Sequence, residues 1–222
     1  MFSSKQSKEK KLLAQAALEY VQGHNIIGVG TGSTANAFID ALASSDIKLT
    51  GAVASSIETE KRLKKAGIPI LDLNNLNGLP VYIDGADVFV EHGYCLKGGG
   101  GALTREKICA AAADKFICIA DGSKQKQILG NFPVVVEVIP MARSFVAREL
   151  VKLGGQPDYR VGFKTDNGNV ILDVHGLNLL DPLKVEEKIN SIPGVVCNGI
   201  FSKEYAAIIL TTADGLVKVI NN

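Results

Sequence analysis

The feature of this sequence that most constrains its fold is an alternation between short, continuously apolar segments and segments with helical periodicity. Helical spacing is clear over residues 35–42 and again over residues 103–113. Strand-like apolar runs occupy residues 25–30, 49–54, 69–73, 81–83 and 115–120. Strands that are apolar along their whole length are buried on both faces. The alternation therefore predicts an α/β fold, with a mostly parallel sheet covered by helices on both faces.

The rhythm changes from about residue 132. The expected elements are a strand at 134–139, a helix at 142–153, strands at 159–163 and 170–174 joined by a hairpin turn at 165–169, a helix begun by Asp181 and Pro182, and a strand at 194–201. This β-α-β-β-α-β order is the split βαβ arrangement of ferredoxin-like domains. A further apolar run at 205–210 is expected to rejoin the first sheet. We therefore predict one domain from residues 1–131 and 204–222, and a smaller α+β domain from residues 132–203.

Composition excludes several classes of partner. The chain of 222 residues is 46% hydrophobic and 21% charged, which predicts a packed globular protein. It has 24 basic and 23 acidic residues, so its net charge of +1 gives no basis for binding nucleic acid or a membrane surface. A small anionic substrate needs only a local positive site and stays possible.

Targeting and metal-binding signals are also absent from the sequence. No apolar run reaches transmembrane length, and the amphipathic N-terminal segment does not resemble a signal peptide, so a cytoplasmic protein is expected. The four cysteines contain no CxxC pair and the three histidines are scattered, so we expect neither disulfides nor a metal site.

Four polar segments follow predicted strands or precede a helix: residues 31–34, 84–87, 97–101 and 121–124. Ligands of open parallel sheets bind outside the carboxyl ends of the strands. Each segment alone is a weak signal, but their expected convergence at one edge of the sheet indicates a binding site there.

The first segment lies in GVGTGST, residues 28–34. It is a near miss to the dinucleotide fingerprint, because the third glycine comes one position early and no acidic residue closes the second strand. Two interpretations stay open. Backbone N–H groups with Thr and Ser hydroxyls at a helix start would hold a phosphate, or Ser33 or Thr34 is an ordinary N-cap.

The second segment, Asp84-Gly85-Ala86-Asp87, carries two aspartates three positions apart after a buried strand. A single Asp-Gly is usually a turn. Two carboxylates with only small residues between them can instead accept hydrogen bonds from sugar hydroxyls and move protons on oxygen. Metal binding is a competing use, but no third ligand is apparent.

The third segment places Lys97 before four glycines, and Glu106 follows in the next helix. Glycines let the backbone approach a ligand and adopt positive φ. On spacing alone, Glu106 is equally well explained as a carboxylate favoured by the helix dipole and as a functional group.

Together these segments resemble ribose-5-phosphate isomerase, type A. The resemblance rests on strings that occur in the family's order over nearly the whole chain: GVGTGSTA (28–35), YIDGAD (82–87), LKGGGGALTREKI (96–108), ADGSK (120–124), VKLGGQPDYR (151–160), TDNGNVILD (165–173) and IPGVV (192–196). It implies a Rossmann-like catalytic domain, a ferredoxin-like small domain, and a cofactor-free enzyme of the non-oxidative pentose phosphate pathway. It also implies a homodimer or a dimer of dimers, with the small domain at the interface. One departure is Val88, where the family often has an acidic residue.

The implied reaction is the interconversion of D-ribose 5-phosphate and D-ribulose 5-phosphate through a cis-enediolate. By resemblance, Glu106 is the proton-shuttling base, which a desolvated setting would tune toward the working pH. Lys97 stabilises the enediolate oxygen, and Asp84 and Asp87 bind hydroxyls and assist ring opening, with Asp84 the better candidate for the oxygen proton. The implied substrate-binding residues are Thr31, Gly32, Ser33, Thr34, Asp84, Gly85, Ala86, Asp87, Lys97, Gly98, Gly99, Gly100 and Lys124. Ser33, Thr34 and Lys124 are expected nearest the phosphate. Lys10 is a weaker phosphate candidate, for which a place in a solvated charged run is the preferred interpretation.

Three other functions fit the sequence less well. A nicotinamide-dependent dehydrogenase is disfavoured by the broken fingerprint, and a cofactor titration tests it. A sugar-phosphate sensor would need a DNA-binding helix-turn-helix and a basic face, which the sequence lacks. A CoA-transferase-like enzyme would use a carboxylate as a nucleophile, and an acyl-CoA exchange assay tests it.

Overall fold

The structure, a computed structural model, describes residues 4–222, which divide into two compact units. The first unit consists of residues 4–86, 105–125 and 206–222, and the second of residues 87–104 and 126–205. The domain boundaries expected from the sequence stay a prediction. The compact units differ from them mainly in residues 87–104, which group with the second unit.

Six strands of the described chain form the sheet of the first unit, in the order β13-β12-β6-β3-β1-β2. Their bounds are β1 Ile26–Val29, β2 Gly51–Ala54, β3 Tyr82–Asp84, β6 Phe116–Ile119, β12 Ile208–Ala213 and β13 Leu216–Asn221. All neighbours are parallel except β12 and β13, which are antiparallel. The predicted α/β class is confirmed, and so is the return of the C-terminal segment to this sheet beside β6.

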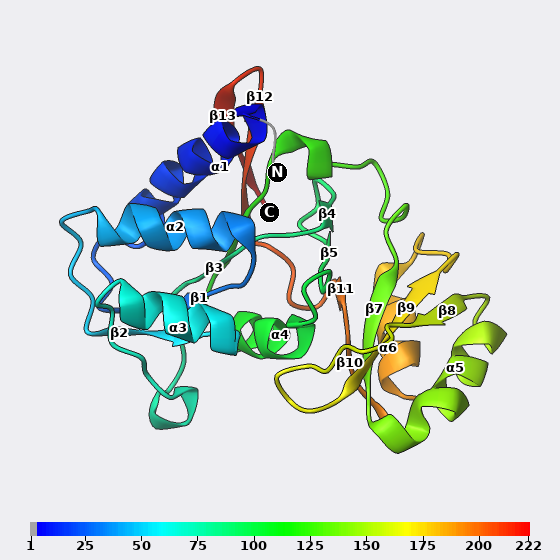
Figure 1. Cartoon of the computed structure of the whole chain (residues 1–222). Coiled ribbons are helices and arrows are strands. Elements are labelled where there is room, and N and C mark those ends of the chain that lie inside the picture. The colour runs from blue at the N-terminus through cyan, green and yellow to red at the C-terminus, as the bar shows by residue number, and fades with distance from the viewer. Residues whose placement is uncertain (1–3) are drawn as a thin grey trace. The chain divides into compact units, whose positions relative to one another are not determined.

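Helices α1 Ser4–Ala17, α2 Ser33–Ala43 and α3 Ile57–Lys65 lie side by side in Figure 1. Their apolar side chains, including Leu13, Phe38 and Leu63, form one core with Ile83 and Ile117 of the strands. Side chains alternate between the faces of a strand. Tyr82 and Asp84 therefore lie on the opposite face of the sheet from Ile83.

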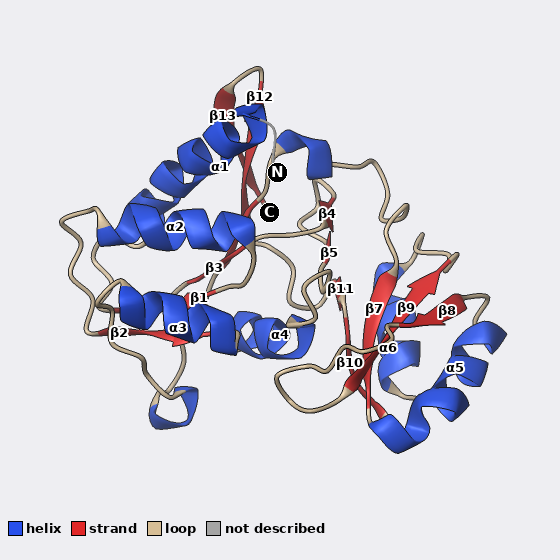
Figure 2. Cartoon of the chain, in the orientation of Figure 1, coloured by secondary structure: helices blue, strands red, loops and turns tan. Residues whose placement is uncertain are grey.

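The second unit contains the expected β-α-β-β-α-β sequence, shown in Figure 2. Its elements are β7 Val134–Val138, α5 Arg143–Lys152, β8 Gln156–Tyr159, β9 Val170–His175, α6 Pro182–Asn190 and β10 Val195–Asn198. The four strands form an antiparallel sheet in the order β10-β7-β9-β8. As predicted, Asp181 caps α6, with its carboxylate accepting from the N–H of Lys184, and Pro182 is the first helical residue.

A small three-stranded sheet in the second unit was not predicted. It consists of β4 Val88–Phe89, β5 Cys95–Leu96 and β11 Ile200–Phe201. The predicted strand at 194–201 is correspondingly wrong as one strand, since β10 pairs with β7 and β11 pairs with β5. The change of sheet occurs at Gly199, where a Cβ atom would lie 2.1 Å from the carbonyl oxygen of Lys97.

Three smaller predictions are also corrected. The strand predicted at 159–163 lies at Gln156–Tyr159, because Gly162 adopts a φ of +75° that an extended strand does not allow. The segment 69–73 makes only a single parallel bridge, between Ile70 and Ala52. The capping-box pattern of Ser55 with Glu58 predicts Ser55 as the N-cap of the following helix. The cap of α3 is instead Ser56, whose hydroxyl accepts from the N–H of Thr59. The tight turn at 165–169 is confirmed by a hydrogen bond from the Thr165 N–H to the Asn169 carbonyl.

Within residues 4–222, the helices are all too short or too polar to cross a membrane.

Candidate active site

The first two glycines of GVGTGST make room for side chains of the neighbouring strand. Gly28 of β1 pairs with Tyr82 of β3, and a Cβ atom at Gly28 would lie 2.8 Å from the tyrosine ring. A Cβ atom at Gly30 would lie 1.9 Å from the carboxyl carbon of Asp84. Tyr82 and Asp84 share one face of β3, so the glycines opposite them also recur every second residue. The spacing of Gly28 and Gly30 is therefore explained by packing against β3 and does not require a bound dinucleotide.

Asp84 is fully buried and its carboxylate is held from both sides. Its Oδ1 accepts from the N–H of Thr31 at 3.0 Å and from the N–H of Gly85 at 2.7 Å. Its Oδ2 accepts from the Tyr82 hydroxyl at 2.5 Å. A buried charge is tolerated only where such donors replace water. The structure therefore brings GVGTGST and DGAD together through Thr31 and Asp84.

Glu106 is only 5% exposed and lies in the first turn of α4 Leu103–Ala111. Burial, followed by the negative charges of Asp84 and Glu106, raises the pKa of Tyr82 well above its usual value. Burial, followed by the same two carboxylates, raises the pKa of the Cys109 thiol to about 12. The phenol and the thiol therefore keep their protons at neutral pH. Both carboxylates act on the same two groups, which places Asp84 and Glu106 in one buried neighbourhood of the first unit.

The start of α2 has the character of an anion site. Its N-cap is Gly32, with a φ of +107° and no capping side chain, so the alternative in which Ser33 or Thr34 is the N-cap is wrong. First-turn N–H groups without a side-chain cap can bind an anion. The Thr31 hydroxyl is used within the protein, where it hydrogen bonds to Ser55 at 2.8 Å and to Thr59 at 3.2 Å.

Lys10, in the charged run 8–11, contacts this helix start. It is partly buried, and its Nζ donates to the Ser33 hydroxyl at 2.8 Å. Burial lowers the pKa of Lys10, the nearby Asp121 opposes this shift, and the positive charge of Lys124 adds to it. Lys124 belongs to a short 3₁₀ turn, Gly122–Lys124, that Asp121 caps. Two lysines and Ser33 are thus gathered near the first turn of α2.

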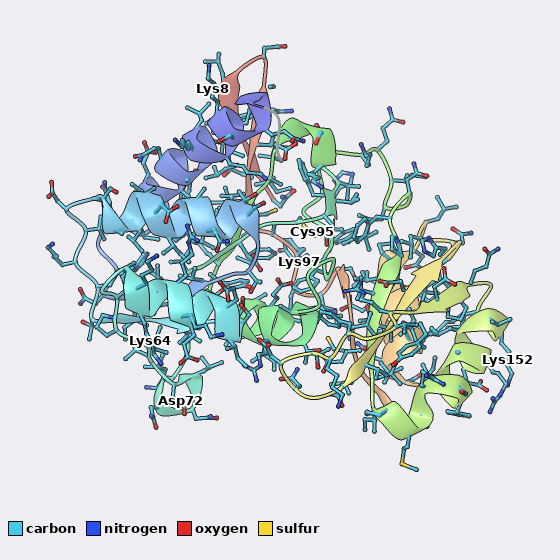
Figure 3. All side chains as sticks on the ribbon, in the orientation of Figure 1. Lys8, Lys64, Asp72, Cys95, Lys97 and Lys152 are labelled. Atoms are coloured by element: carbon cyan, nitrogen blue, oxygen red, sulfur yellow. The ribbon has the colours of Figure 1, made fainter. Side chains whose placement is uncertain are left out.

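Lys97 and Asp87 lie in the second unit. Lys97 follows β5 directly and is only 3% exposed, whereas Lys64 and Lys152, labelled with it in Figure 3, are exposed partners of Glu60 and Glu149. The Lys97 ammonium lies 5.5 Å from the centre of the Phe201 ring, a cation–π contact.

The glycine run is explained mostly by packing within the second unit. Gly98 has a φ of +111°, and its Cβ atom would lie 2.9 Å from Val135. The Gly99 N–H donates to Asp87 at 2.9 Å, and a Cβ atom there would also lie 2.9 Å from that carboxylate. Gly101 has a φ of +77°, and its Cβ atom would lie 2.3 Å from the Phe163 ring. Gly100 alone among the four has open space around its Cβ position and no positive φ.

The predicted site residues are distributed over both units. The first unit contains Thr31, Gly32, Ser33, Thr34, Asp84, Gly85, Ala86, Glu106 and Lys124, and the second contains Asp87, Lys97, Gly98, Gly99 and Gly100. The chain passes between the units inside DGAD and again inside α4, between Thr104 and Arg105. Among residues 4–222 there is no group of three or more His, Cys, Asp or Glu side chains that could hold a metal ion.

Sequence reasoning missed several residues around these groups. Tyr82 could have been found, because it stands two positions before Asp84 and must share its face of the strand. Glu137 could also have been found, since a lone carboxylate in the apolar strand Val134–Val138 is unusual and needs donors. The contact of Lys10 with Ser33 joins positions 23 residues apart and has no local signal.

Comparison with known proteins places this geometry in a family. A family model described as ribose 5-phosphate isomerase A (phosphoriboisomerase A) matches residues 51–215. The ribose-5-phosphate isomerase A of Acidithiobacillus ferrooxidans (strain ATCC 53993 / BNL-5-31) is 59% identical over 206 residues, which cover 93% of this chain and 94% of that protein.

Solved structures agree. The crystal structure of ribose 5 phosphate isomerase A from Neisseria gonorrhoeae superposes with a TM-score of 0.96 at 45% identity, covering 100% of this chain and 99% of that one. A D-ribose-5-phosphate isomerase solved in complex with phospho-erythronic acid gives a TM-score of 0.91 at 34% identity, covering 98% of this chain and 99% of that one.

The fold and these relatives define an enzyme that isomerises a sugar phosphate, exchanging aldose and ketose. The chain belongs to the ribose 5-phosphate isomerase A family, and its substrate is ribose 5-phosphate of the pentose phosphate pathway.

Proposed function

We propose that this chain interconverts D-ribose 5-phosphate and D-ribulose 5-phosphate through a cis-enediolate, with Glu106 as the base that moves the proton between carbons. The observation that carries the proposal is the burial of Glu106 and Asp84 in one neighbourhood, where both carboxylates act on Tyr82 and Cys109. A buried carboxylate is less strongly solvated as an anion and is a better proton shuttle than an exposed one.

In the forward direction Glu106 removes the proton from C2 of the open-chain aldose, and the electron pair moves through C1 onto the aldehyde oxygen. This forms the enediolate. Asp84 carries the hydroxyl proton from O2 to O1, and Glu106 returns its proton to C1, which leaves a ketone at C2. Lys97, buried and positively charged, stabilises the negative oxygen of the intermediate. Asp87 binds hydroxyl groups and assists ring opening together with Asp84.

The phosphate is assigned to the start of α2. The contact between Lys10 and Ser33, the nearby Lys124 and the helix start capped only by Gly32 supply positive charge and donors there. Gly32 and Thr34 line the same turn, and Thr31 acts by donating its N–H to Asp84. Gly85, Ala86 and the backbone of Gly98, Gly99 and Gly100 bind the sugar. The binding of phospho-erythronic acid, a phosphorylated sugar acid, by a relative supports a site for a sugar phosphate.

The test is conversion of ribose 5-phosphate to the ketose by purified protein, with EDTA present and no nicotinamide added. Glu106→Gln should lose at least about a hundredfold in turnover, as expected for removal of a general base. Glu149→Gln is the matched control, because Glu149 lies on α5 and pairs with Lys152 at the surface, and it should keep full turnover. Near-normal turnover by Glu106→Gln would show that the base is another residue.

The proposed assembly is a homodimer or a dimer of dimers that forms through the second unit. Large apolar side chains are exposed there, with Met141 at 93%, Val161 at 81% and Leu180 at 75% of their full exposure. Apolar surface of this kind is typical of contacts between subunits. Light scattering coupled to gel filtration should give at least twice the mass of the chain, and a monomer at micromolar concentration would contradict the proposal.

A further inference from the structure

Two carboxylates lie on the face of the β7–β9 sheet that is turned away from its helices. Alternate residues of β7, including Val136 and Val138, pack in a core with Val146 of α5 and Ile189 of α6. The intervening positions of β7 and β9 face the other way. They include the two carboxylates, Glu137 and Asp173, together with Val135 and Ile171, which pack against Leu103.

Glu137 is fully buried and is surrounded by neutral donors. Its Oε2 accepts from the hydroxyl of Thr104. Its Oε1 accepts from the Thr165 hydroxyl at 2.8 Å, from Asn169 Nδ2 at 2.7 Å and from Asn167 Nδ2 at 3.1 Å. This single carboxylate therefore connects the turn at 165–169 to the second residue of α4.

Asp173 connects the same sheet to the glycine run through Arg160. The Arg160 guanidinium donates to both carboxylate oxygens of Asp173, at 2.8 and 2.5 Å. Its remaining nitrogen, Nη1, donates to the carbonyl of Gly99 at 3.2 Å and reaches that of Gly98 at 3.5 Å. The guanidinium also lies 5.3 Å from the centre of the Phe163 ring, on which Gly101 packs.

These six residues, Glu137, Arg160, Thr165, Asn167, Asn169 and Asp173, are called the polar clamp below. The clamp holds the chain at Gly98–Gly99 and again at Thr104, and so fixes both ends of the segment between Lys97 and Glu106. Stability alone gives little reason for a polar cluster centred on the fully buried Glu137, because apolar residues of similar volume often stabilise a core equally well or better. Such a cluster can instead serve to fix the position of the chain segment between Lys97 and Glu106.

We propose that the polar clamp consists of positioning residues for the isomerisation, which act through Lys97 and Glu106. The inference rests on the roles proposed above for those two residues. Thr104 and Glu106 both lie in the first turn of α4, so anchoring the Thr104 side chain limits how the base can turn or shift. Displacement of a catalytic group by about 1 Å can lower a rate by about a hundredfold.

The sharpest test uses Thr104 rather than Glu137. Removing the Glu137 carboxylate would strand several buried donors and could prevent folding. Thr104→Val keeps the shape of the side chain and removes only its hydroxyl, and Thr104→Ser restores a hydroxyl. Thr211→Val is the matched control, since Thr211 is a buried threonine of β12 whose hydroxyl has no hydrogen-bond partner among the described residues.

We expect Thr104→Val to lower kcat about 10- to 100-fold while KM for ribose 5-phosphate changes less than about threefold. Thr104→Ser should recover most of the loss, and Thr211→Val should keep the wild-type kcat. Arg160→Lys, which keeps the charge but cannot reach Asp173 and Gly99 together, should also lower kcat. Circular dichroism and thermal unfolding of every variant establish the folded fraction.

A double variant separates positioning from a general loss of structure. If Thr104 acts through Glu106, Thr104→Val should cost almost nothing further in a Glu106→Gln background. Wild-type kcat in both Thr104→Val and Arg160→Lys, or a full multiplicative loss in the double variant, would overturn the clamp while leaving the proposed function intact. High turnover by Glu106→Gln alone would instead overturn the proposed function, and the clamp inference with it.

Discussion

Asp84 is the residue around which the first unit's part of the site is built. Its fully buried carboxylate accepts from the N–H groups of Thr31 and Gly85 and from the hydroxyl of the fully buried Tyr82. Hydrogen bonds to a charged group are stronger than those between neutral groups. Tyr82 is therefore more than a core aromatic, because it orients the carboxylate proposed to carry the oxygen proton.

Tyr82→Phe should destabilise the protein by about 1.5–3 kcal/mol, the range for a hydrogen bond to a charged group. Turnover should fall by about tenfold or less, because the two N–H donors still hold Oδ1. Urea unfolding and the isomerase assay measure the two effects. Tyr205→Phe is the control, since Tyr205 is 46% exposed and its substitution should change stability by less than about 0.5 kcal/mol. Equal stability of the two variants would contradict the role given to the Tyr82 hydroxyl.

The glycine run between β5 and α4 combines positions of two kinds. Gly98 and Gly101 have positive φ and contact Val135 and Phe163, so the fold itself requires them. Gly100 meets neither condition. Packing within the protein therefore does not explain why this position is a glycine. Binding of the sugar to the Gly100 backbone offers an explanation.

A pair of alanine variants tests this distinction. Gly101→Ala should destabilise the protein by about 1–3 kcal/mol, because it introduces both a strained φ and a clash with Phe163. Gly100→Ala should leave the free energy of unfolding within about 0.5 kcal/mol of wild type and weaken ribose 5-phosphate binding, measured by calorimetry. Comparable destabilisation by both variants, or unchanged binding by Gly100→Ala, would refute this account of the run.

Elements with a strong periodic pattern were predictable from the sequence, whereas those defined by distant contacts were not. The parallel strands and the Asp181-Pro182 helix start have local signals, and both are present. The segment 194–201 is apolar except for Asn198, yet it divides into two strands at Gly199, because that residue meets the carbonyl of Lys97 about 100 positions away. The two-residue strands β4 and β5 are too short for periodicity to reveal.

The residues of the candidate site also include some with local sequence signals and some that depend on distant contacts. Motifs and family resemblance single out Asp84, Lys97 and Glu106 as candidates, because their residue types stand in recognisable strings, and their catalytic roles stay predictions. The supporting contacts of Tyr82, Lys10 and Glu137 arise only from the folded chain, since they depend on which strand or helix lies alongside. Spacing within one segment does not contain that information.

The stability of the protein at alkaline pH depends on two buried groups near Asp84 and Glu106, the Cys109 thiol and the Tyr82 phenol. Burial raises the pKa of the Cys109 thiol from its usual 9.0 to about 12 in the folded state. Between these two values the unfolded chain releases the thiol proton while the folded chain keeps it. The contribution of the protonated Cys109 thiol to the free energy of unfolding is therefore fully present below pH 9. It is lost as the pH rises toward 12. The raised pKa of Tyr82 acts in the same direction at higher pH.

Cys109→Ser removes the titrating thiol and so isolates its contribution. Between pH 8 and pH 10, the free energy of unfolding of the wild type should fall by roughly 1 kcal/mol more than that of the variant. Urea unfolding at each pH, with a reductant present, measures the difference between the two slopes. Parallel slopes would mean that Cys109 ionises in the folded protein as readily as in the unfolded chain. They would also mean that burial and the negative charges of Asp84 and Glu106 do not raise its pKa.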